Sequence, residues 1–205
     1  MLSNRNRNKM TITERLILRE IQTKDSESMH RYRNLPDVSR YQDWVPDSPQ
    51  EVRELATEMA RRNAFSVGEW YQIAILNRFN DTLVGDLAVC IEKDTEKQAE
   101  LGIALDPSFQ KQGIARESVD AICEYLFNEK KLHRIHVSID PRNENSFNLF
   151  YKIGFRKEGL MLENHFSKNQ WCDTLVMAIL KREWIAFDNL PGKSFSYDRI
   201  ARSLQ

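Results

Sequence analysis

The segment from Gln110 to Ala115 contains the residue types that hold a diphosphate. Gly113 stands where a helix is expected to begin, and no Asp, Asn, Ser or Thr directly precedes it to satisfy the first N–H groups of that helix. Those groups and the partial positive charge of a helix start attract anions, and Lys111 and Arg116 add positive charge beside them. The segment therefore predicts a pyrophosphate cradle. A helix-starting turn that merely contains a glycine is the alternative.

The strand expected just before this segment, Ala99 to Leu105, has two unlike faces. One face carries large apolar side chains, and the other carries Glu100, Gly102 and Ala104. A strand face with so little side-chain bulk lets another molecule approach the backbone. The sequence thus predicts an accessible strand next to the anion site.

The elements that must position these residues follow from periodicity and turn signals. In the first half we expect an edge strand over Ile12 to Leu18, a helix capped by Asp25, and a second helix starting at Ser48-Pro49. Two further strands, Trp70 to Leu76 and Leu83 to Ile91, form a predicted hairpin.

Helices and strands alternate in the second half. An amphipathic helix begins near Ala115, and another runs from Asn143 to Tyr151 and ends at Gly154. Strands are expected over His136 to Ile139, Phe155 to Leu160 and Leu175 to Leu180. This order predicts a mixed sheet with helices on its faces, and nothing after Trp184 is strongly patterned.

Composition narrows the class of protein. Lysine plus arginine and aspartate plus glutamate both total 30, so nucleic-acid binding, which usually needs a basic excess, is not expected. The cysteines Cys90, Cys123 and Cys172 are odd in number and lack metal or CxxC spacing, so we expect reduced thiols, no metal and a cytoplasmic protein. No apolar run is long enough to span a bilayer, so no membrane partner is expected.

These motifs together resemble the GNAT superfamily of N-acetyltransferases. Residues Gln110-Lys111-Gln112-Gly113-Ile114-Ala115 are similar to its acetyl-CoA signature, and residues 99–115 are similar to the branch that acetylates ribosomal-protein N-termini. Further similar segments, in the expected order, are Arg15-Leu16-Ile17-Leu18-Arg19, Asp140 to Ser146, Gly154-Phe155, and Trp171 with Asp173. The resemblance covers the chain from about Thr11 to Trp184.

The resemblance implies an α/β, mixed α+β, fold. A central mixed, mostly antiparallel sheet is splayed into a V with helices on both faces, over residues 11–184, with tails at 1–10 and 185–205. Acetyl-CoA is the implied co-substrate, with its pantetheine arm along Ile103 and Leu105 and facing Asn143. The implied cofactor-binding residues of the cradle are Gln110, Lys111, Gln112, Gly113, Ile114, Ala115 and Arg116, and the backbone amides from Gln112 to Arg116 would hold the pyrophosphate. A Rossmann or P-loop site is disfavoured, because the chain has neither glycine motif.

Acetyl transfer to an amine needs a base and a donor for the oxyanion. Glu100 is the first candidate base, acting through a water, although it also fits a solvated strand position. Asp86, Glu163 and His165 are the fallback bases. A backbone N–H near Leu105 is the expected oxyanion donor.

The acid that protonates the departing thiolate is expected in the helix after Asn143. Many relatives carry a tyrosine four residues before the glycine of Gly-Phe, but Phe150 stands there, and Tyr151 is about 100° further round the helix. Ser146, three residues after Asn143, matches the N-terminal acetyltransferase branch and is the better candidate. The alternative is a first-turn serine in a helix that Asn143 caps.

The sequence therefore predicts an N-acetyltransferase that moves an acetyl group from acetyl-CoA to a primary amine. The branch resemblance favours a protein N-terminal amine, and a polyamine, an amino acid or an aminoglycoside is the alternative acceptor. A catalytically silent acyl-CoA-binding module is a third interpretation, because of Phe150. Tyr41, Trp44 and Trp70 either shape the acceptor pocket or pack in the core, and a homodimer is among the expected assemblies.

Overall fold

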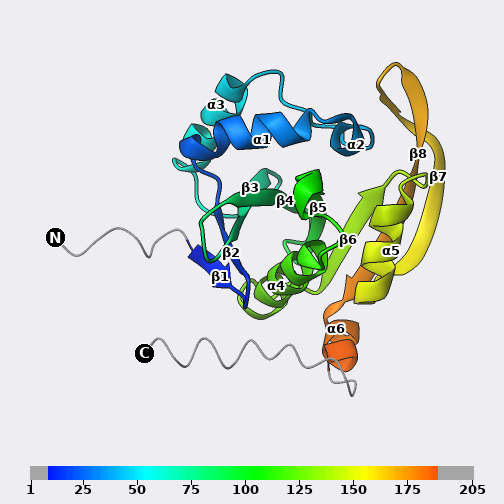
Figure 1. Cartoon of the computed structure of the whole chain (residues 1–205). Coiled ribbons are helices and arrows are strands. Elements are labelled where there is room, and N and C mark those ends of the chain that lie inside the picture. Colours follow the sequence, from blue (N-terminus) through cyan, green and yellow to red (C-terminus); the bar gives the residue numbers. More distant parts are fainter. Residues whose placement is uncertain (1–8, 189–205) are drawn as a thin grey trace, which may run out of the picture.

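One continuous sheet organises the protein (Figure 1). A computed structural model describes residues 9–188. The strands lie in the order β1-β2-β3-β4-β5-β6-β8-β7, and only β5 and β6 are parallel neighbours. Their bounds are β1 Lys9–Ile12, β2 Leu16–Glu20, β3 Trp70–Asn77, β4 Leu83–Ile91, β5 Gln98–Leu105, β6 Arg134–Ile139, β7 Arg156–Ser167 and β8 Gln170–Leu180. The predicted mixed, mostly antiparallel sheet is confirmed.

Helices cover both faces of this sheet (Figure 1). The helices are α1 Ser26–Arg33, α2 Pro36–Ser39, α3 Pro49–Met59, α4 Ile114–Asn128, α5 Glu144–Ile153 and α6 Lys181–Asp188, with 3-10 turns at Thr23–Asp25 and Pro107–Phe109. The start of α3 follows the expected chemistry, since Ser48 accepts a hydrogen bond from the Glu51 N–H. Asp25 stands at the start of α1 as predicted, but its side chain makes no capping hydrogen bond there and pairs with Arg19 instead (2.7 Å). No helix within residues 9–188 is long and apolar enough to cross a membrane.

Alternate residues of β5 belong to two different apolar cores. Ala104 packs in the core that contains Met29 of α1 and Val52 of α3. Leu101 and Leu105 belong to the other core, with side chains of α4 and α5. The face that carries Glu100, Gly102 and Ala104 therefore looks toward the α1–α3 side, in agreement with the predicted alternation.

The sheet opens into a V between β5 and β6. The two strands pair only where Gln98–Glu100 meets Arg134–His136. Beyond Glu100, β5 continues to Leu105 along β4, while β6 continues along β8. A parallel pair needs a long crossover, which here is α4, and α4 starts a few residues after β5 ends. The helix start therefore lies at the wide end of the V.

The N-terminal prediction was wrong in one respect, because Ile12 to Leu18 is two strands instead of one. The chain turns after Ile12, so β1 is the edge strand and β2 lies second. Thr13 stabilises the turn: its N–H donates to the Leu16 carbonyl (2.9 Å), and its Oγ1 accepts from the Leu16 N–H (2.8 Å). Such local side-chain bonding competes with a straight strand, and hydrophobic periodicity does not reveal it.

The last hairpin is much longer than the two strands expected at its base. β7 reaches Ser167 and β8 begins at Gln170, so the hairpin projects beyond the sheet (Figure 1). Its outer half is exposed, and its apolar side chains Leu162, Phe166 and Trp171 are not buried in either core, so no core-facing alternation marked it in the sequence. The folded part also exceeds 11–184, since β1 begins at Lys9 and α6 continues to Asp188. The rest of both predicted tails lies outside the described residues.

Candidate active site

The α4 start has the form predicted for an anion site. Gly113 is the N-cap residue, with φ of 79°, and no side chain caps the helix. Lys111, two residues earlier, also has a positive φ of 59°. The Glu117 N–H donates to the Gly113 carbonyl (3.1 Å), which leaves the N–H groups of residues 114–116 without an acceptor inside the helix. Left-handed residues in such a loop turn successive N–H groups toward one concave side that suits an anion.

Arg15, in the turn between β1 and β2, braces this loop. Its Nη1 donates to the Gln112 carbonyl (3.0 Å) and its Nε to Glu117 Oε2 (2.6 Å). The buried Glu117 carboxylate also accepts from the Arg15 N–H and the Thr13 hydroxyl. Sequence reasoning assigned Arg15 no role at the site. Its only signal was its place in a segment that resembles the family.

The polar side chains of the cradle are partly used within the protein. Gln110 Nε2 donates to the Leu105 carbonyl (3.2 Å) and Gln112 Nε2 to the Ser108 carbonyl (2.9 Å). Arg116 Nε lies 3.5 Å from Asp120 Oδ2, one turn along α4. The backbone N–H groups are therefore better suited than these three side chains to meet an anion.

The backbone of β5 faces the V at alternate residues. The Glu92 N–H donates to the Gln98 carbonyl (2.9 Å) and the Asp106 N–H to the Val84 carbonyl (3.0 Å), so even-numbered residues from 98 to 106 hydrogen-bond to β4. The N–H groups of Ile103 and Leu105 then point to the other side, where β6 has separated from β5. This geometry is what an extended amide-containing ligand needs in order to pair with a strand.

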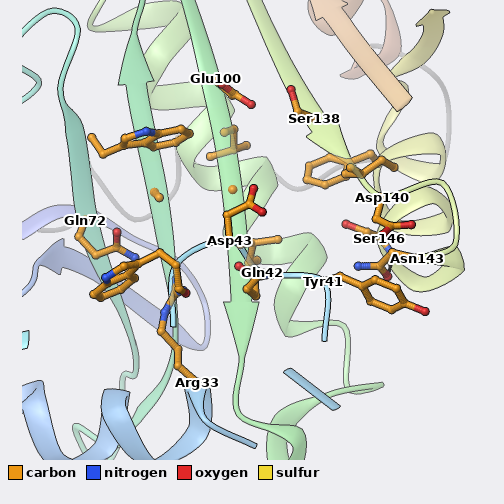
Figure 2. A pocket seen from close by; sticks show the side chains of 18 of the residues that line it. Arg33, Tyr41, Gln42, Asp43, Gln72, Glu100, Ser138, Asp140, Asn143 and Ser146 are labelled. Carbon is orange, nitrogen blue, oxygen red and sulfur yellow. Dashed lines mark hydrogen bonds between the residues drawn. The ribbon is translucent and has the colours of Figure 1, made fainter. Parts of the chain in front are cut away.

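A cavity of ≈ 460 Å³ lies at the V and brings several predicted residues together. Glu100 and Ile103 line it from β5, and Asn143 and Ser146 line it from α5. In Figure 2, Glu100 lies near Ser138 at one end, while Asn143 and Ser146 lie together at another wall. The aromatic side chains Tyr41, Trp44 and Trp70 also line this cavity. The cradle residues 110–116 and Leu105 lie outside its lining.

Ser146 lies in the first turn of a capped helix and also lines the cavity. Asn143 Oδ1 accepts from the Ser146 N–H (3.1 Å), so Asn143 caps α5 as the structural alternative required. Ser146 nevertheless lines the cavity, and so does Phe150. Tyr151 is 64% exposed and stacks on Phe147, so it turns away from the cavity as predicted. Capping and a place in the cavity therefore coexist.

Asp86, a fallback base, is held in a buried network. Its carboxylate is fully buried and accepts hydrogen bonds from Tyr32, Arg33 and Gln72. Burial and the Asp86 charge raise the pKa of the Tyr32 hydroxyl well above its ordinary value. Asp86 does not line the cavity, although Arg33 does. A carboxylate in such a buried ion pair is a poor proton acceptor, because accepting a proton leaves the guanidinium unpaired.

The other acidic and basic side chains near the cavity are either paired or lie outside its wall. Hydrogen bonds from Arg142 lower the pKa of Asp140, which lines the cavity. Glu163 is exposed on β7 and lines neither this cavity nor its neighbour. His165 lines only the neighbouring cavity, where its Nδ1 is 3.2 Å from Thr174 Oγ1. Glu100 therefore remains the best-placed candidate base.

The neighbouring cavity, of ≈ 260 Å³, extends the site toward the projecting hairpin. Tyr41, Asp43 and Asp140 line both cavities. Above them the hairpin tip touches the loop after α2, since Lys168 Nζ donates to the Ser39 carbonyl and the Ser167 hydroxyl to Asp43 Oδ1 (3.2 Å). We call these contacts the clasp, and they connect two segments more than 120 residues apart in the sequence.

A V-splayed sheet with an uncapped helix start at its wide end is the architecture of an acyl-CoA-dependent transferase. Comparison with known proteins gives the same class. The family model of the acetyltransferase (GNAT) domain matches residues 15–156. The chain is 32% identical over 172 residues to the uncharacterized N-acetyltransferase YnaD of Bacillus subtilis (strain 168), covering 84% of this chain and 97% of that protein.

Two further relatives differ in the acceptor that their names state. The crystal structure of spermidine N-acetyltransferase from Vibrio cholerae, in complex with CoA and spermine, matches with a TM-score of 0.72 at 23% identity, over 83% of this chain and 98% of that one. The ribosomal protein uS5 alanine N-acetyltransferase of Escherichia coli (strain K12) is 29% identical over 84 residues, which is 41% of this chain and 43% of that protein. This chain belongs to the GNAT acetyltransferase family, and it is an acetyl-transferring enzyme.

Proposed function

We propose that the chain transfers an acetyl group from acetyl-CoA to the primary amine of a small molecule, with Glu100 as base and Ser146 as acid. One observation carries the proposal. Glu100 on β5 and Ser146 on α5 line a single cavity in the V, and Ile103 lies in its wall.

The residues present fit coenzyme A. The uncapped start of α4 suits a diphosphate, and the β5 edge in the V suits the amide groups of the pantetheine arm. Backbone N–H groups of residues 112–116 would hold the phosphates, and Ile103, Leu105 and Asn143 would meet the arm. When bound, acetyl-CoA supplies an acetyl group activated as a thioester.

Glu100 would prepare the acceptor. A primary amine is mostly protonated at neutral pH and must lose that proton before it can attack. The Glu100 carboxylate lines the cavity and is partly exposed, so a water can carry the proton to it. The N–H groups of Ile103 and Leu105, which point away from β4, would be the donors for the oxygen that gains charge.

Ser146 would give a proton to the departing thiolate. It lies in the first turn of α5, where the partial positive charge of the helix start stabilises a hydroxyl that loses its proton. No side-chain hydrogen bond of its hydroxyl is present within residues 9–188, so the hydroxyl is free to turn toward the cavity.

The charges around the two cavities favour one amine over a polyamine. A polycation needs a clear acidic excess, but Asp140 is neutralised by Arg142, and Arg40 and Lys168 line the neighbouring cavity as cations. The aromatic walls suit an acceptor with an apolar body. The clasp closes over this space, which favours a small molecule over a long peptide.

Release of free thiol from acetyl-CoA with a panel of amines tests the proposal. Glu100→Gln and Ser146→Ala should each lower kcat about 10²-fold or more, since general acid–base groups contribute that much. Acetyl-CoA should still raise the melting temperature of both variants. Glu129→Gln and Ser66→Ala, at positions outside both cavities, are matched controls that should keep wild-type kcat.

A protein N-terminal amine is the second candidate acceptor. The place of Ser146 relative to Asn143 and the likeness to the uS5 alanine enzyme favour it. Turnover with short peptides of free N-terminus, and none with small amines, would replace the first candidate by this one. Acetyl-CoA binding without turnover on any amine would instead support a silent acyl-CoA-binding module, which Phe150 makes worth testing.

A further inference from the structure

A histidine lies between two glutamates at the narrow end of the V. His136 is the β6 residue that pairs with Glu100 of β5. Its Nε2 is 3.9 Å from Glu100 Oε2, and its Nδ1 is 3.5 Å from Glu92 Oε1. Nδ1 is buried and has no hydrogen-bond partner within residues 9–188. Buried polar atoms without a partner are rare in native structures, and a role in catalysis is one of the reasons for them.

The three side chains lead from the cavity to the surface. Glu100 lines the cavity. The His136 side chain is 14% exposed and the Glu92 side chain 38% exposed. An imidazole can accept a proton on one ring nitrogen and release one from the other. The order Glu100, His136, Glu92 therefore suits a proton path from the cavity to the surface.

The remaining groups around His136 do not compete for the proton. Burial, followed by the charges of Glu100 and Glu92, raises the pKa of the Cys90 thiol on β4, so the thiol stays neutral. Arg134, on the same face of β6, is paired with Glu158 (2.6 Å). Lys93 lies beside Cys90 as a cation, and the β8 neighbour of His136 is Ala178, which cannot titrate.

We propose that His136 is a positioning residue that regenerates Glu100 by passing its proton to Glu92 and water. The proton leaves the protonated amine for the Glu100 carboxylate. It then passes from Glu100 to Nε2 of His136, while the proton on Nδ1 leaves for Glu92, which releases it to solvent. A side-chain rotation or one water closes the gap at each ring nitrogen. His136 is left with its proton on Nε2, and exchange with water removes that proton and returns one to Nδ1, so proton and charge balance over the whole cycle. The inference rests on the proposed function, in which Glu100 is the base.

Two substitutions separate a relay from a structural role. His136→Gln keeps hydrogen-bonding groups but cannot carry a proton, and His136→Ala leaves space for free imidazole. Both should lower kcat about tenfold, with KM for acetyl-CoA and melting temperature unchanged, because only proton transfer is impaired. Added imidazole should restore kcat of His136→Ala. His133→Gln, an exposed histidine outside both cavities, should behave as wild type.

Variants of Glu100 distinguish failure of the relay from failure of the proposed function. The double variant Glu100→Gln/His136→Gln should be no slower than Glu100→Gln, because both residues act on one proton. Wild-type kcat in His136→Gln, with Glu100→Gln slow, overturns the relay and leaves the proposed function intact. A slow His136→Ala that imidazole does not restore also overturns the relay and indicates a structural role. Wild-type kcat in Glu100→Gln, or no turnover by the unaltered protein, overturns the base assignment and the relay together.

Discussion

Glu100 differs from the neighbouring carboxylates in its partners. Asp86 is held by Arg33, and Asp140 is held by Arg142, so protonation of either breaks an ion pair with a guanidinium. Within residues 9–188, Glu100 has no guanidinium partner, and its ion-pair neighbour is the imidazole of His136, at 3.9 Å. The capacity to accept a proton is thus decided by contacts at the level of single side chains, and carboxylates that look equal in the sequence differ in the fold.

The alkylation rate of the Cys90 thiol tests its electrostatic contact with Glu100 without an activity assay. Burial, and then Glu100 and Glu92, raise the pKa of the Cys90 thiol. Glu100→Gln removes one of those charges and should lower that pKa, so more thiolate forms and Cys90 reacts faster with iodoacetamide at pH 8. Peptide mass mapping over time measures the rate, and Glu129→Gln should leave it unchanged. An unaltered rate in Glu100→Gln would contradict the electrostatic contact.

Arg142 makes stability depend on pH through Asp140. Its hydrogen bonds lower the pKa of Asp140, so the folded value lies below the unfolded one. The stabilisation is present above the unfolded pKa of about 4 and is lost as pH falls through the folded value. Arg142→Ala should therefore unfold at lower urea than wild type at pH 7, and the two midpoints should converge in acid. Arg182→Ala, an exposed control on α6, should show no such convergence.

At the scale of elements, the start of α4 is prepared by its own loop and by a distant turn. Gly113 and Lys111 supply the left-handed backbone, and Arg15 ties the loop to the β1–β2 turn. A cradle built from backbone N–H groups depends on conformation more than on side-chain identity. Glycine at position 113 is therefore expected to matter for the shape of the cradle.

Gly113→Ala should weaken acetyl-CoA binding by about tenfold or more, because an alanine in this left-handed conformation is strained by roughly 1–2 kcal/mol. That Cβ would also lie 3.4 Å from Arg15 Nη2, on the bracing side of the loop. Gly154→Ala also places a Cβ at a positive φ, of 108°, at the end of α5 away from the cradle, and is the control. Calorimetry with CoA should show lower affinity for Gly113→Ala alone. Equal affinities would argue against a backbone cradle.

At the scale of the whole molecule, the space proposed for the acceptor lies between segments far apart in the chain. The loop after α2 and the β7–β8 hairpin meet at the clasp, and the V lies between β5 and β6 beneath it (Figure 1). The clasp consists of exposed polar contacts, which are weak individually. It is therefore suited to open for an acceptor and to close again.

Lys168→Ala removes the bonds from the hairpin tip to the Ser39 and Arg40 carbonyls. We expect KM for the amine to rise about three- to tenfold, while KM for acetyl-CoA stays the same, because only the acceptor side loses enclosure. Lys152→Ala on the exposed face of α5 changes the same charge elsewhere and is the control. Steady-state kinetics with both substrates varied measures the effect. A change confined to KM for acetyl-CoA would contradict this role.

Much of the fold was predictable because the signals are local. The alternation along Ala99 to Leu105, the caps at Ser48 and Asn143, and the glycine before α4 each act within a few residues, and each prediction is confirmed. The Thr13 turn and the outer half of the last hairpin were missed. A side-chain bond defines the first, and cross-strand pairing without a buried apolar face defines the second.

The sequence alone determined the sheet type, the helix start that suits a diphosphate and the candidate pair Glu100 and Ser146. Only the tertiary structure decided that these two line one cavity, that Asp86 is engaged by Arg33, and that His136 lies beside Glu100. Helix caps and strand alternation arise from neighbours in the chain. Pairing of carboxylates with cations or imidazoles arises from strands and helices that meet in space, and local periodicity carries no record of those distances.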